Sequence, residues 1–157
     1  MKKFAIFAAS MLGCAMMSAQ PAPGSFEQTW TRGPEWLRDG VIYQVYPSSY
    51  KDSDGNGIGD IRGVISELDY IESLGVRAIW FNPLFVSGWI DGGYDVIDFY
   101  RVDPRFGTNN DMVELIEKAH AKGIKVMLDL VAGHTSDKHP WFIQSSQDTN
   151  LQYSDYY

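Results

Sequence analysis

The sequence predicts an α/β fold in which helices cover a parallel β-sheet. Three short apolar segments typical of strands (41–45, 76–81 and 125–130) alternate with two segments in which apolar residues recur at helical spacing. This order of strands and helices is that of a parallel sheet with right-handed crossovers. Two folds share it, an open doubly wound sheet and an eight-stranded barrel. In both folds the chemistry lies at the carboxyl ends of the strands.

The first strand is the β-branched and aromatic segment VIYQV (41–45), which ends at Tyr46-Pro47. After a loop rich in Asp and Gly, apolar residues recur every three or four positions up to Gly75, a residue suited to the left-handed end of a helix. These residues are Ile61, Val64, Ile65, Leu68, Ile71 and Leu74. The pattern predicts one helix with one buried face.

The second strand is VRAIWF (76–81), which is almost continuously apolar and breaks at Asn82-Pro83. Such a segment is typical of a strand that is covered on both faces. A long loop follows, and the sequence predicts no regular structure in it before Thr108.

The second helix begins with a capping box, because Thr108 is followed three residues later by Asp111 and then by a helical apolar pattern. Gly123 ends this helix. The third strand, KVMLDL (125–130), is again mostly apolar, and polar residues crowd its carboxyl end. We therefore expect the site of chemistry near this end of the sheet.

The loop DSDGNGIGD (52–60) places oxygen-bearing side chains at alternate positions, separated by glycines. Ca²⁺ binds roughly 6 to 8 oxygen ligands at about 2.3–2.6 Å. The residues that would supply side-chain oxygens or, at Ile58, a carbonyl oxygen are Asp52, Asp54, Asn56, Ile58 and Asp60. The alternative is an Asp/Gly turn in which Asp60 only caps the next helix. Because like charges this close repel unless a cation joins them, the spacing favours calcium.

The first nineteen residues have the layout of a secretory signal peptide: Lys2 and Lys3, an apolar run, and small residues at the end. We expect residues 1–19 to be cleaved, 20–35 to form a leader, and 36–157 to form the domain. The mature chain would then have no transmembrane span, and no cysteine, since Cys14 is the only one. The destination would be periplasmic, cell-surface or secreted.

The formal net charge is −7, and removal of the two lysines makes it more negative. A negative chain is unsuited to nucleic-acid backbones and fits cations or neutral substrates. The loop after the first strand also lacks the G-x-G-x-x-G pattern that binds nucleotide phosphates, which weakens the nucleotide-binding alternative.

Several segments in this order resemble the N-terminal part of the alpha-amylase family of glycoside hydrolases (family 13), which includes amylases, oligo-1,6-glucosidases and neopullulanases. They are YQVYPSSYKDSDGNGIGDIRGV, AIWFNP, GYDVIDFYRVDPRFGT and KVMLDLVAGHTSDKHPWF, and the similarity runs from about Trp36 to the end. The resemblance implies a (β/α)8 TIM barrel, of which this chain would contain the first three strand-helix units before it is truncated at Tyr157.

The same resemblance implies roles for individual residues. The loop at 52–60 would bind calcium, in agreement with the argument from spacing. Tyr94 would stack on the sugar next to the scissile bond, where Asp95 would share the subsite, and an aromatic ring suits the C–H face of a sugar. Asp129 would be a buried carboxylate that organises the site, and His134 would bind sugar hydroxyls. Gly133 replaces the asparagine that many amylases use for a further calcium, so we expect no second calcium there.

No residue of this chain is predicted to be catalytic. Retaining hydrolysis needs two carboxyl groups about 5–5.5 Å apart, and the family's nucleophile and acid/base would lie beyond Tyr157. We expect the N-terminal portion of an exported retaining hydrolase of alpha-glucans or alpha-linked oligosaccharides, inactive by itself. The alternatives are a non-catalytic amylase-like protein for carbohydrate binding or protein interaction, and a calcium-dependent structural module.

Overall fold

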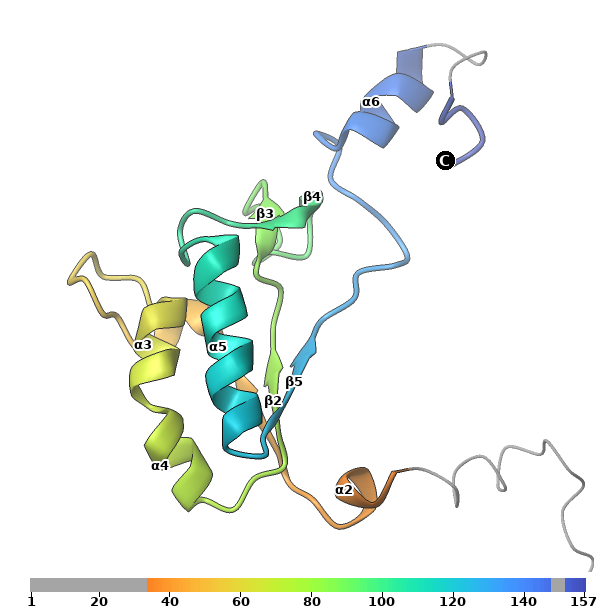
Figure 1. The fold of residues 1–157 in the computed structure, drawn as a ribbon. Helices are drawn as coiled ribbons and strands as arrows, with labels where there is room; N and C mark the ends of the chain where they lie inside the picture. Colours follow the sequence, from red (N-terminus) through yellow and green to blue (C-terminus); the bar gives the residue numbers. More distant parts are fainter. Residues whose placement is uncertain (1–33, 148–151) are drawn as a thin grey trace, which may run out of the picture. The chain divides into compact units, whose positions relative to one another are not determined.

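The computed structural model describes residues 34–147 and 152–157 (Figure 1). The predicted signal peptide and most of the predicted leader lie outside the described residues. A single helical turn, α2 (Glu35–Arg38), precedes the first strand. Within the described part of the chain, no helix is long and apolar enough to cross a membrane.

The main sheet contains three parallel strands in the order β1 (Ile42–Val45), β2 (Ala78–Phe81) and β5 (Lys125–Leu128). The sequence predicted these three strands and their parallel arrangement. Each is shorter than predicted, because the terminal residues of the apolar segments lie outside the ladder. The strands stand in sequence order, so each crossover leads to the adjacent position in the sheet.

The first crossover contains two short helices, α3 (Ile61–Ser66) and α4 (Leu68–Ser73), where the sequence predicted one. The break lies at Glu67, whose backbone has φ −101° and ψ 4°. The apolar face continues through the break, because Val64 and Leu68 are both buried in one core. The periodicity therefore predicted the buried face correctly, although it did not predict the interruption.

The second crossover is α5 (Asn109–Ala121), and the predicted capping box is confirmed. The backbone N–H of Asp111 donates to Thr108 Oγ1 at 3.2 Å, and the Asp111 carboxylate accepts from the backbone N–H of Thr108 at 2.8 Å. At the other end Gly123 has φ +74°, a left-handed conformation that suits glycine after a helix.

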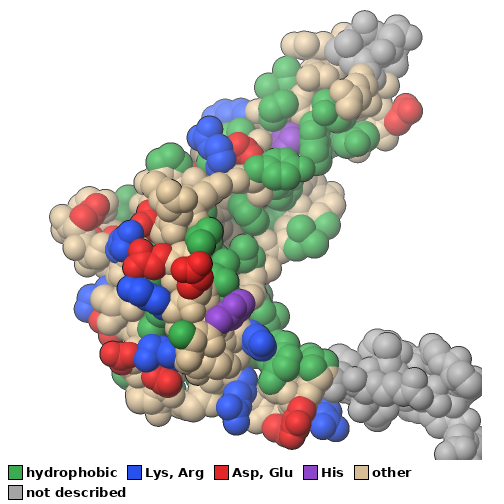
Figure 2. All heavy atoms as spheres, in the orientation of Figure 1, with side chains coloured by type: hydrophobic (Ala, Val, Ile, Leu, Met, Phe, Trp, Pro, Cys, Tyr) green, Lys and Arg blue, Asp and Glu red, His purple; other side chains and the backbone are tan. Residues whose placement is uncertain are grey.

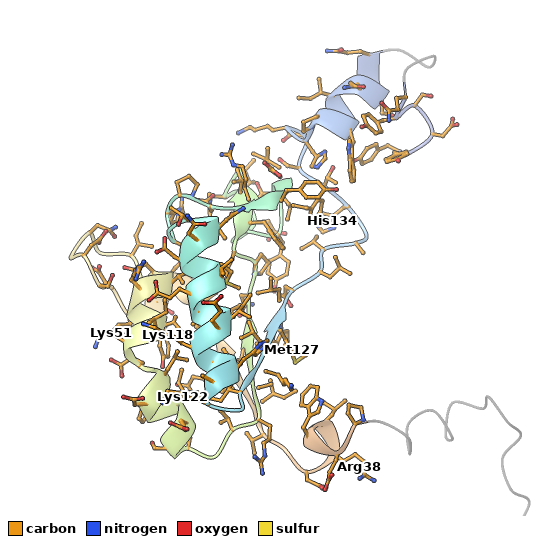
Figure 3. All side chains as sticks on the ribbon, in the orientation of Figure 1. Arg38, Lys51, Lys118, Lys122, Met127 and His134 are labelled. Atoms are coloured by element: carbon orange, nitrogen blue, oxygen red, sulfur yellow. The ribbon has the colours of Figure 1, made fainter. Side chains whose placement is uncertain are left out.

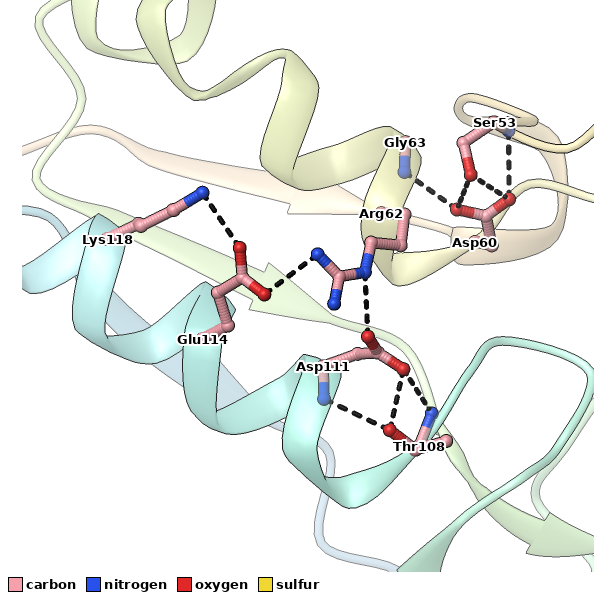
Figure 4. A network of polar contacts seen from close by, with 8 residues as sticks. All are labelled: Ser53, Asp60, Arg62, Gly63, Thr108, Asp111, Glu114 and Lys118. Carbon is pink, nitrogen blue, oxygen red and sulfur yellow. Dashed lines mark hydrogen bonds and ion pairs between the residues drawn. The ribbon is translucent and has the colours of Figure 1, made fainter.

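Charged side chains tie α3 to α5 at the surface (Figure 4). Arg62 contacts Asp111 Oδ1 at 2.7 Å and Glu114 Oε2 at 2.8 Å, and Lys118 contacts Glu114 Oε1 at 2.8 Å. Side chains of both signs gather over these helices (Figure 2). Exposed pairs of this kind contribute little individually, so the burial of apolar side chains between helices and sheet dominates the packing.

The long loop after β2 contains an antiparallel hairpin that the sequence did not predict, formed by β3 (Phe85–Ser87) and β4 (Val96–Val102). Its first strand has three residues, and the register shifts on both sides of Val86. So short and irregular a strand leaves no alternating pattern to detect. A 3₁₀ turn, η1 (Pro47–Ser49), and a helix, α6 (Pro140–Gln147), were also not predicted.

Alternation along the strands separates two faces of the main sheet. Val45, Ile79 and Phe81 belong to the core beneath the helices. Because successive side chains of a strand point to opposite faces, Gln44 and Trp80 lie on the face away from α3, α4 and α5. This second face carries the polar residues described next.

Candidate functional site

Polar side chains gather where the three parallel strands end. The register places Gln44 beside Trp80 and Trp80 beside Met127. Asn82 and Asp129 directly follow β2 and β5, two residues beyond Trp80 and Met127, so they continue this face of the sheet. The backbone N–H of Asn82 donates to Val45 O at the end of β1, and that of Asp129 donates to Phe81 O at the end of β2, both at 3.1 Å. These bonds extend the parallel ladder by one step. The carboxyl end of the sheet therefore has a fixed backbone.

One chain of hydrogen bonds joins these side chains to the hairpin. Tyr94 Oη and Trp80 Nε1 both donate to the Asp129 carboxylate at 2.7 Å, to Oδ2 and Oδ1 respectively. Asn82 Nδ2 donates to Tyr94 Oη at 3.0 Å, and Gln44 Nε2 donates to Asn82 Oδ1 at 2.9 Å. We call these five residues the strand-end network.

The Tyr94 hydroxyl is held in its protonated form. Its hydrogen bond to Asp129 raises the pKa of Tyr94 above the ordinary value, burial adds to the effect, and the hydrogen bond from Asn82 opposes it. Tyr94 is half-buried. The network thus fixes the ring through its hydroxyl while part of the side chain stays accessible.

Tight turns in the hairpin place Tyr94 next to the sheet. Gly92 and Gly93 have φ of +59° and +103°, and the Tyr94 N–H donates to Asp91 O at 2.9 Å. A Cβ at Gly93 would lie 3.3 Å from Pro83 O. Glycine is therefore required there both by conformation and by the closeness of the segment after β2.

Trp89 anchors the other side of this turn and is the only non-glycine residue of the described chain with positive φ, at 57°. Its Nε1 donates to the buried Asp103 at 2.8 Å, and its ring packs on Phe106 with centroids 5.3 Å apart. The Arg105 guanidinium lies 3.8 Å from the ring centroid. Three contacts to the segment 103–106 thus hold a conformation that is unfavourable for tryptophan.

Asp95 organises the hairpin from within. Its carboxylate accepts from Ser87 Oγ at 2.8 Å and from the N–H groups of Ile90 and Asp91, each at 3.2 Å. Burial works against its ionisation, but these hydrogen bonds prevail and lower the pKa of the Asp95 carboxyl. The side chain therefore fixes the loop that carries Tyr94, and it is not part of the strand-end network.

His134 lies on the extended segment after β5, next to the hairpin (Figure 3). Its Nε2 is 3.1 Å from Tyr94 O, and the residue is exposed. Asp129 and His134 line a hollow of about 540 Å³ together with aromatic residues that include Phe99 and Trp141. The structure thus brings Tyr94, Asp129 and His134 together, with Asp95 one residue away in the supporting loop.

His139 stabilises the start of α6 beside this hollow. It is buried, its ring lies 4.4 Å from that of Trp141, and its Nδ1 accepts from the Trp141 N–H at 3.1 Å at the start of α6. Burial lowers the pKa of His139. A neutral imidazole with a free Nδ1 is required for that hydrogen bond.

The Asp/Gly loop curls its oxygens toward one another. Carboxylate atoms of Asp52, Asp54 and Asp60 all lie within 4.8 Å of one another. Gly55 and Gly57, with φ of +81° and +89°, allow the curl. A hard cation prefers such oxygen donors, which fit calcium chemically.

The same oxygens also accept hydrogen bonds from the loop itself. Asp52 accepts from the N–H groups of Gly55 and Gly57, both at 2.7 Å. Asp60 accepts from Ser53 N at 2.8 Å and caps α3 by accepting from Gly63 N at 2.7 Å. The helix-capping role weighed as an alternative is thus present, and a carboxylate has enough lone pairs to combine it with a cation.

Residues 44–157 match the model of the alpha amylase catalytic domain, which covers more than half of the chain. The chain belongs to the alpha-amylase family of glycoside hydrolases. The resemblance found in its sequence motifs is confirmed. Catalytic domains of this family are TIM barrels, and the three parallel strands with helices on one face are compatible with part of such a barrel.

Several curated members of the alpha-amylase family are similar to this chain. An oligo-1,6-glucosidase of Heyndrickxia coagulans is 47% identical over 123 residues, which are 78% of this chain and 22% of the relative. A trehalose-6-phosphate hydrolase of Escherichia coli (strain K12) is 50% identical over 112 residues, which are 71% and 20% of the two chains. The chain spans about a fifth of the length of these relatives.

Solved structures of the family superpose on the same segment. The trehalose-6-phosphate hydrolase of Bacillus licheniformis gives a TM-score of 0.77 at 47% identity, over 79% of this chain and 22% of that one. The isomaltulose synthase of Klebsiella sp. LX3 gives 0.76 at 46% identity, over 80% and 22%. Members named for different reactions thus share the arrangement that this chain adopts.

Sequence reasoning did not identify three members of the strand-end network, Gln44, Trp80 and Asn82. A signal was available, since each stands at or just after the carboxyl end of a predicted strand, where chemistry lies in barrel folds. Asn82 follows β2 two residues after Trp80, so the two side chains share a face. Their partners could not be read from the sequence, because Tyr94 reaches them from a hairpin that was not predicted.

Proposed function

We propose that this chain is the N-terminal portion of an exported retaining glycoside hydrolase that acts on alpha-glucans or alpha-linked oligosaccharides. The observation that carries the proposal is the convergence of Tyr94, Asp129 and His134 at the carboxyl end of the sheet, in a chain of the alpha-amylase family. The curated relatives include an oligo-1,6-glucosidase and a glucan 1,6-alpha-glucosidase, which supports alpha-linked saccharides as the substrate class.

In this proposal Tyr94 presents its ring as a platform for the sugar at the scissile bond, with its hydroxyl held by Asp129. A sugar face of C–H groups packs well against an aromatic ring. His134 is exposed beside Tyr94, and because its Nε2 contacts Tyr94 O, its other ring nitrogen, Nδ1, would meet sugar hydroxyls. Asp129 orients the Tyr94 hydroxyl. Asp95 contributes to the same subsite by fixing the turn that carries Tyr94.

The nucleophile and the acid/base of the reaction come from the rest of the protein. Retaining hydrolysis forms and then hydrolyses a covalent glycosyl intermediate between two carboxyl groups. Asp95 is engaged within the hairpin and Asp129 accepts two short hydrogen bonds, so neither is free to attack an anomeric carbon. The 157 residues alone are therefore inactive in this proposal.

The decisive assay is release of glucose or of reducing sugar by the protein that carries this chain, on isomaltose, isomaltooligosaccharides, maltooligosaccharides, trehalose 6-phosphate and sucrose. Turnover of at least one, with retention of the anomeric configuration in the first product observed by NMR, supports the proposal. Binding of these saccharides without turnover would instead favour the amylase-like binding protein.

We also propose that the loop at 52–60 binds a structural calcium ion. Asp52, Asp54 and Asp60 would hold it through their convergent carboxylates, joined by the Asn56 side chain and the Ile58 carbonyl. The ion would neutralise three neighbouring negative charges and stabilise the loop before α3. It has no part in the chemistry of the sugar.

Calcium titration by calorimetry tests this proposal directly. Asp54→Asn keeps the size of the side chain and removes one charge, so we expect weaker calcium binding and a smaller rise in melting temperature on calcium addition. Asp39→Asn, an equal change of charge at the exposed end of α2, serves as the control. A variant Asp54→Asn that binds calcium as tightly as the wild type would contradict the assignment.

Export rests on the sequence alone, since residues 1–33 lie outside the described part of the chain. We propose cleavage near Ala19 and a periplasmic, cell-surface or secreted destination. N-terminal sequencing of the protein recovered from its own host checks this. A mature protein that retains the apolar run from Phe4 to Met17 would contradict it.

A further inference from the structure

Asn82 lies between Gln44 and Tyr94 in the strand-end network and donates to the Tyr94 hydroxyl, which itself donates to Asp129. Its backbone is fixed, because its N–H donates to the end of β1 at 3.1 Å and the next residue, Pro83, is buried. Its side chain bridges Gln44 on β1 and Tyr94 in the hairpin. One amide thus connects the sheet to the residue that presents an aromatic ring to the site.

The Asp129 carboxylate, which can only accept, determines the direction of each hydrogen bond in the strand-end network. The indole N–H of Trp80 can only donate and the Asp129 carboxylate can only accept. The single proton of the Tyr94 hydroxyl points to Asp129 at 2.7 Å, so toward Asn82 this hydroxyl can only accept. The Asn82 amide supplies that donor only in one orientation, and the Gln44 amide group donates to its other end at 2.9 Å.

We propose that Asn82 is a positioning residue for the saccharide site. Its amide fixes the hydroxyl of Tyr94 as a donor to Asp129, and Gln44 fixes the orientation of the amide. The inference rests on the proposed function, in which Tyr94 is the platform for the sugar. Asn82 itself need not touch the substrate, because its effect passes through the hydroxyl and the ring orientation of Tyr94.

Loss of the amide leaves Tyr94 with one hydrogen bond in place of two and allows its hydroxyl to turn about the C–O bond. A hydrogen bond of this kind is worth roughly a factor of ten in an equilibrium. Asn82→Ala should therefore lower kcat/KM on the preferred saccharide about tenfold. Gln44→Ala should have a smaller effect in the same direction, since it removes only the group that orients the amide.

A double-mutant cycle with Tyr94→Phe isolates this route. Phenylalanine keeps the ring and removes the hydroxyl on which Asn82 acts, so Asn82→Ala in that background should change kcat/KM by less than about twofold. Asn110→Ala, the same substitution at an exposed position of α5, is the matched control and should leave kcat/KM unchanged. If the effects of Asn82→Ala and Tyr94→Phe on kcat/KM multiply independently, the positioning role of Asn82 is wrong.

Asn82→Asp provides an isosteric test that keeps the acceptor for Gln44. Its ionised carboxyl cannot donate to Tyr94, whereas its protonated form can, and the titratable groups that face it are Tyr94 and Asp129, with Asp91 nearby. We expect the ratio of kcat/KM of Asn82→Asp to kcat/KM of Asn82→Ala to rise as the pH falls, because the introduced carboxyl becomes protonated. A pH-independent ratio would contradict a role in donation.

A spectroscopic readout separates this inference from the proposed function. The indole N–H resonance of Trp80, assigned with Trp80→Phe in protein labelled with ¹⁵N-tryptophan, reports the position of the Asp129 carboxylate. Asn82→Ala and Tyr94→Phe should each shift it, the double variant should add little, and Asn110→Ala should leave it in place. An unmoved resonance in Asn82→Ala overturns the inference even in an active enzyme. Shifts as expected without turnover or binding of any saccharide would confirm the hydrogen-bond route from Asn82 through Tyr94 to Asp129, but would refute the proposed function and with it a role of Asn82 at a saccharide site.

Discussion

Replacement of Trp89 by glycine tests whether the contacts of this residue outweigh its unfavourable backbone conformation. At φ 57° a tryptophan costs roughly 1–2 kcal/mol relative to glycine, so conformation alone predicts that Trp89→Gly stabilises the hairpin. The contacts predict the reverse. The side chain donates to buried Asp103, packs edge-on against Phe106 and lies under the guanidinium of Arg105.

The magnitudes favour the contacts. The hydrogen bond to a carboxylate, the aromatic pair and the exposed cation–π contact together contribute roughly 4 kcal/mol. After relief of the backbone conformation, Trp89→Gly should destabilise the hairpin by about 2 kcal/mol, equivalent to about thirtyfold in its opening equilibrium. Trp89→Phe keeps the packing and loses the N–H, so its effect should be smaller.

Hydrogen exchange of a peptide that covers residues 85–96 is the appropriate assay, because it reports local opening within a larger protein. We expect exchange to become about thirtyfold faster in Trp89→Gly and to change less in Trp89→Phe. Exchange in α5 serves as the internal reference. Slower exchange in Trp89→Gly would show that backbone conformation dominates, and the reasoning from contacts would be refuted.

The remaining predictions concern the helix cap, its pH dependence and the turn before Tyr94. Thr108→Ala removes the cap of α5 and should lower the free energy of unfolding by about 1 kcal/mol, measured by urea denaturation. The hydrogen bond from Thr108, followed by the contacts with Arg62, lowers the pKa of Asp111 in the folded state. Its stabilising contribution is therefore complete above the ordinary carboxyl pKa and is lost as the pH falls through the lowered value, and Asp111→Asn should flatten this part of a stability profile against pH. Gly93→Ala places a side chain at φ +103° and 3.3 Å from Pro83 O, so it should displace Tyr94 and reduce kcat/KM.

The sequence and the structure agree best where local rules decide the conformation. The capping box at Thr108 and the left-handed glycines at the helix ends depend on neighbouring residues alone, and all were readable. The break at Glu67 was not, because helical periodicity continues across it. The hairpin was missed because its first strand is held by β4 and by the buried Asp103 rather than by its own pattern.

The candidate site likewise contains residues that the sequence indicated and contacts that only the structure showed. The resemblance to the family indicated Tyr94 and Asp95 through the motif GYD, and Asp129 and His134 through the segment DLVAGH. The sequence did not show that Asp95 turns into its own loop, or that Asn82 and Trp80 complete the hydrogen bonds of Tyr94 and Asp129. These partners are separated by 12 to 49 positions in the chain, and no local pattern relates them.

By itself, the sequence determined the three parallel strands, the helical segments between them with their buried faces, and the family to which the chain belongs, because these follow from periodicity, capping residues and motifs that are local in the chain. Only the tertiary structure decided how the strand ends are joined. Parallel pairing places residues from three distant segments on one face, and the hairpin then adds Tyr94 to them. The direction of a hydrogen bond depends on which donors and acceptors meet in space, and that meeting is a property of the folded chain.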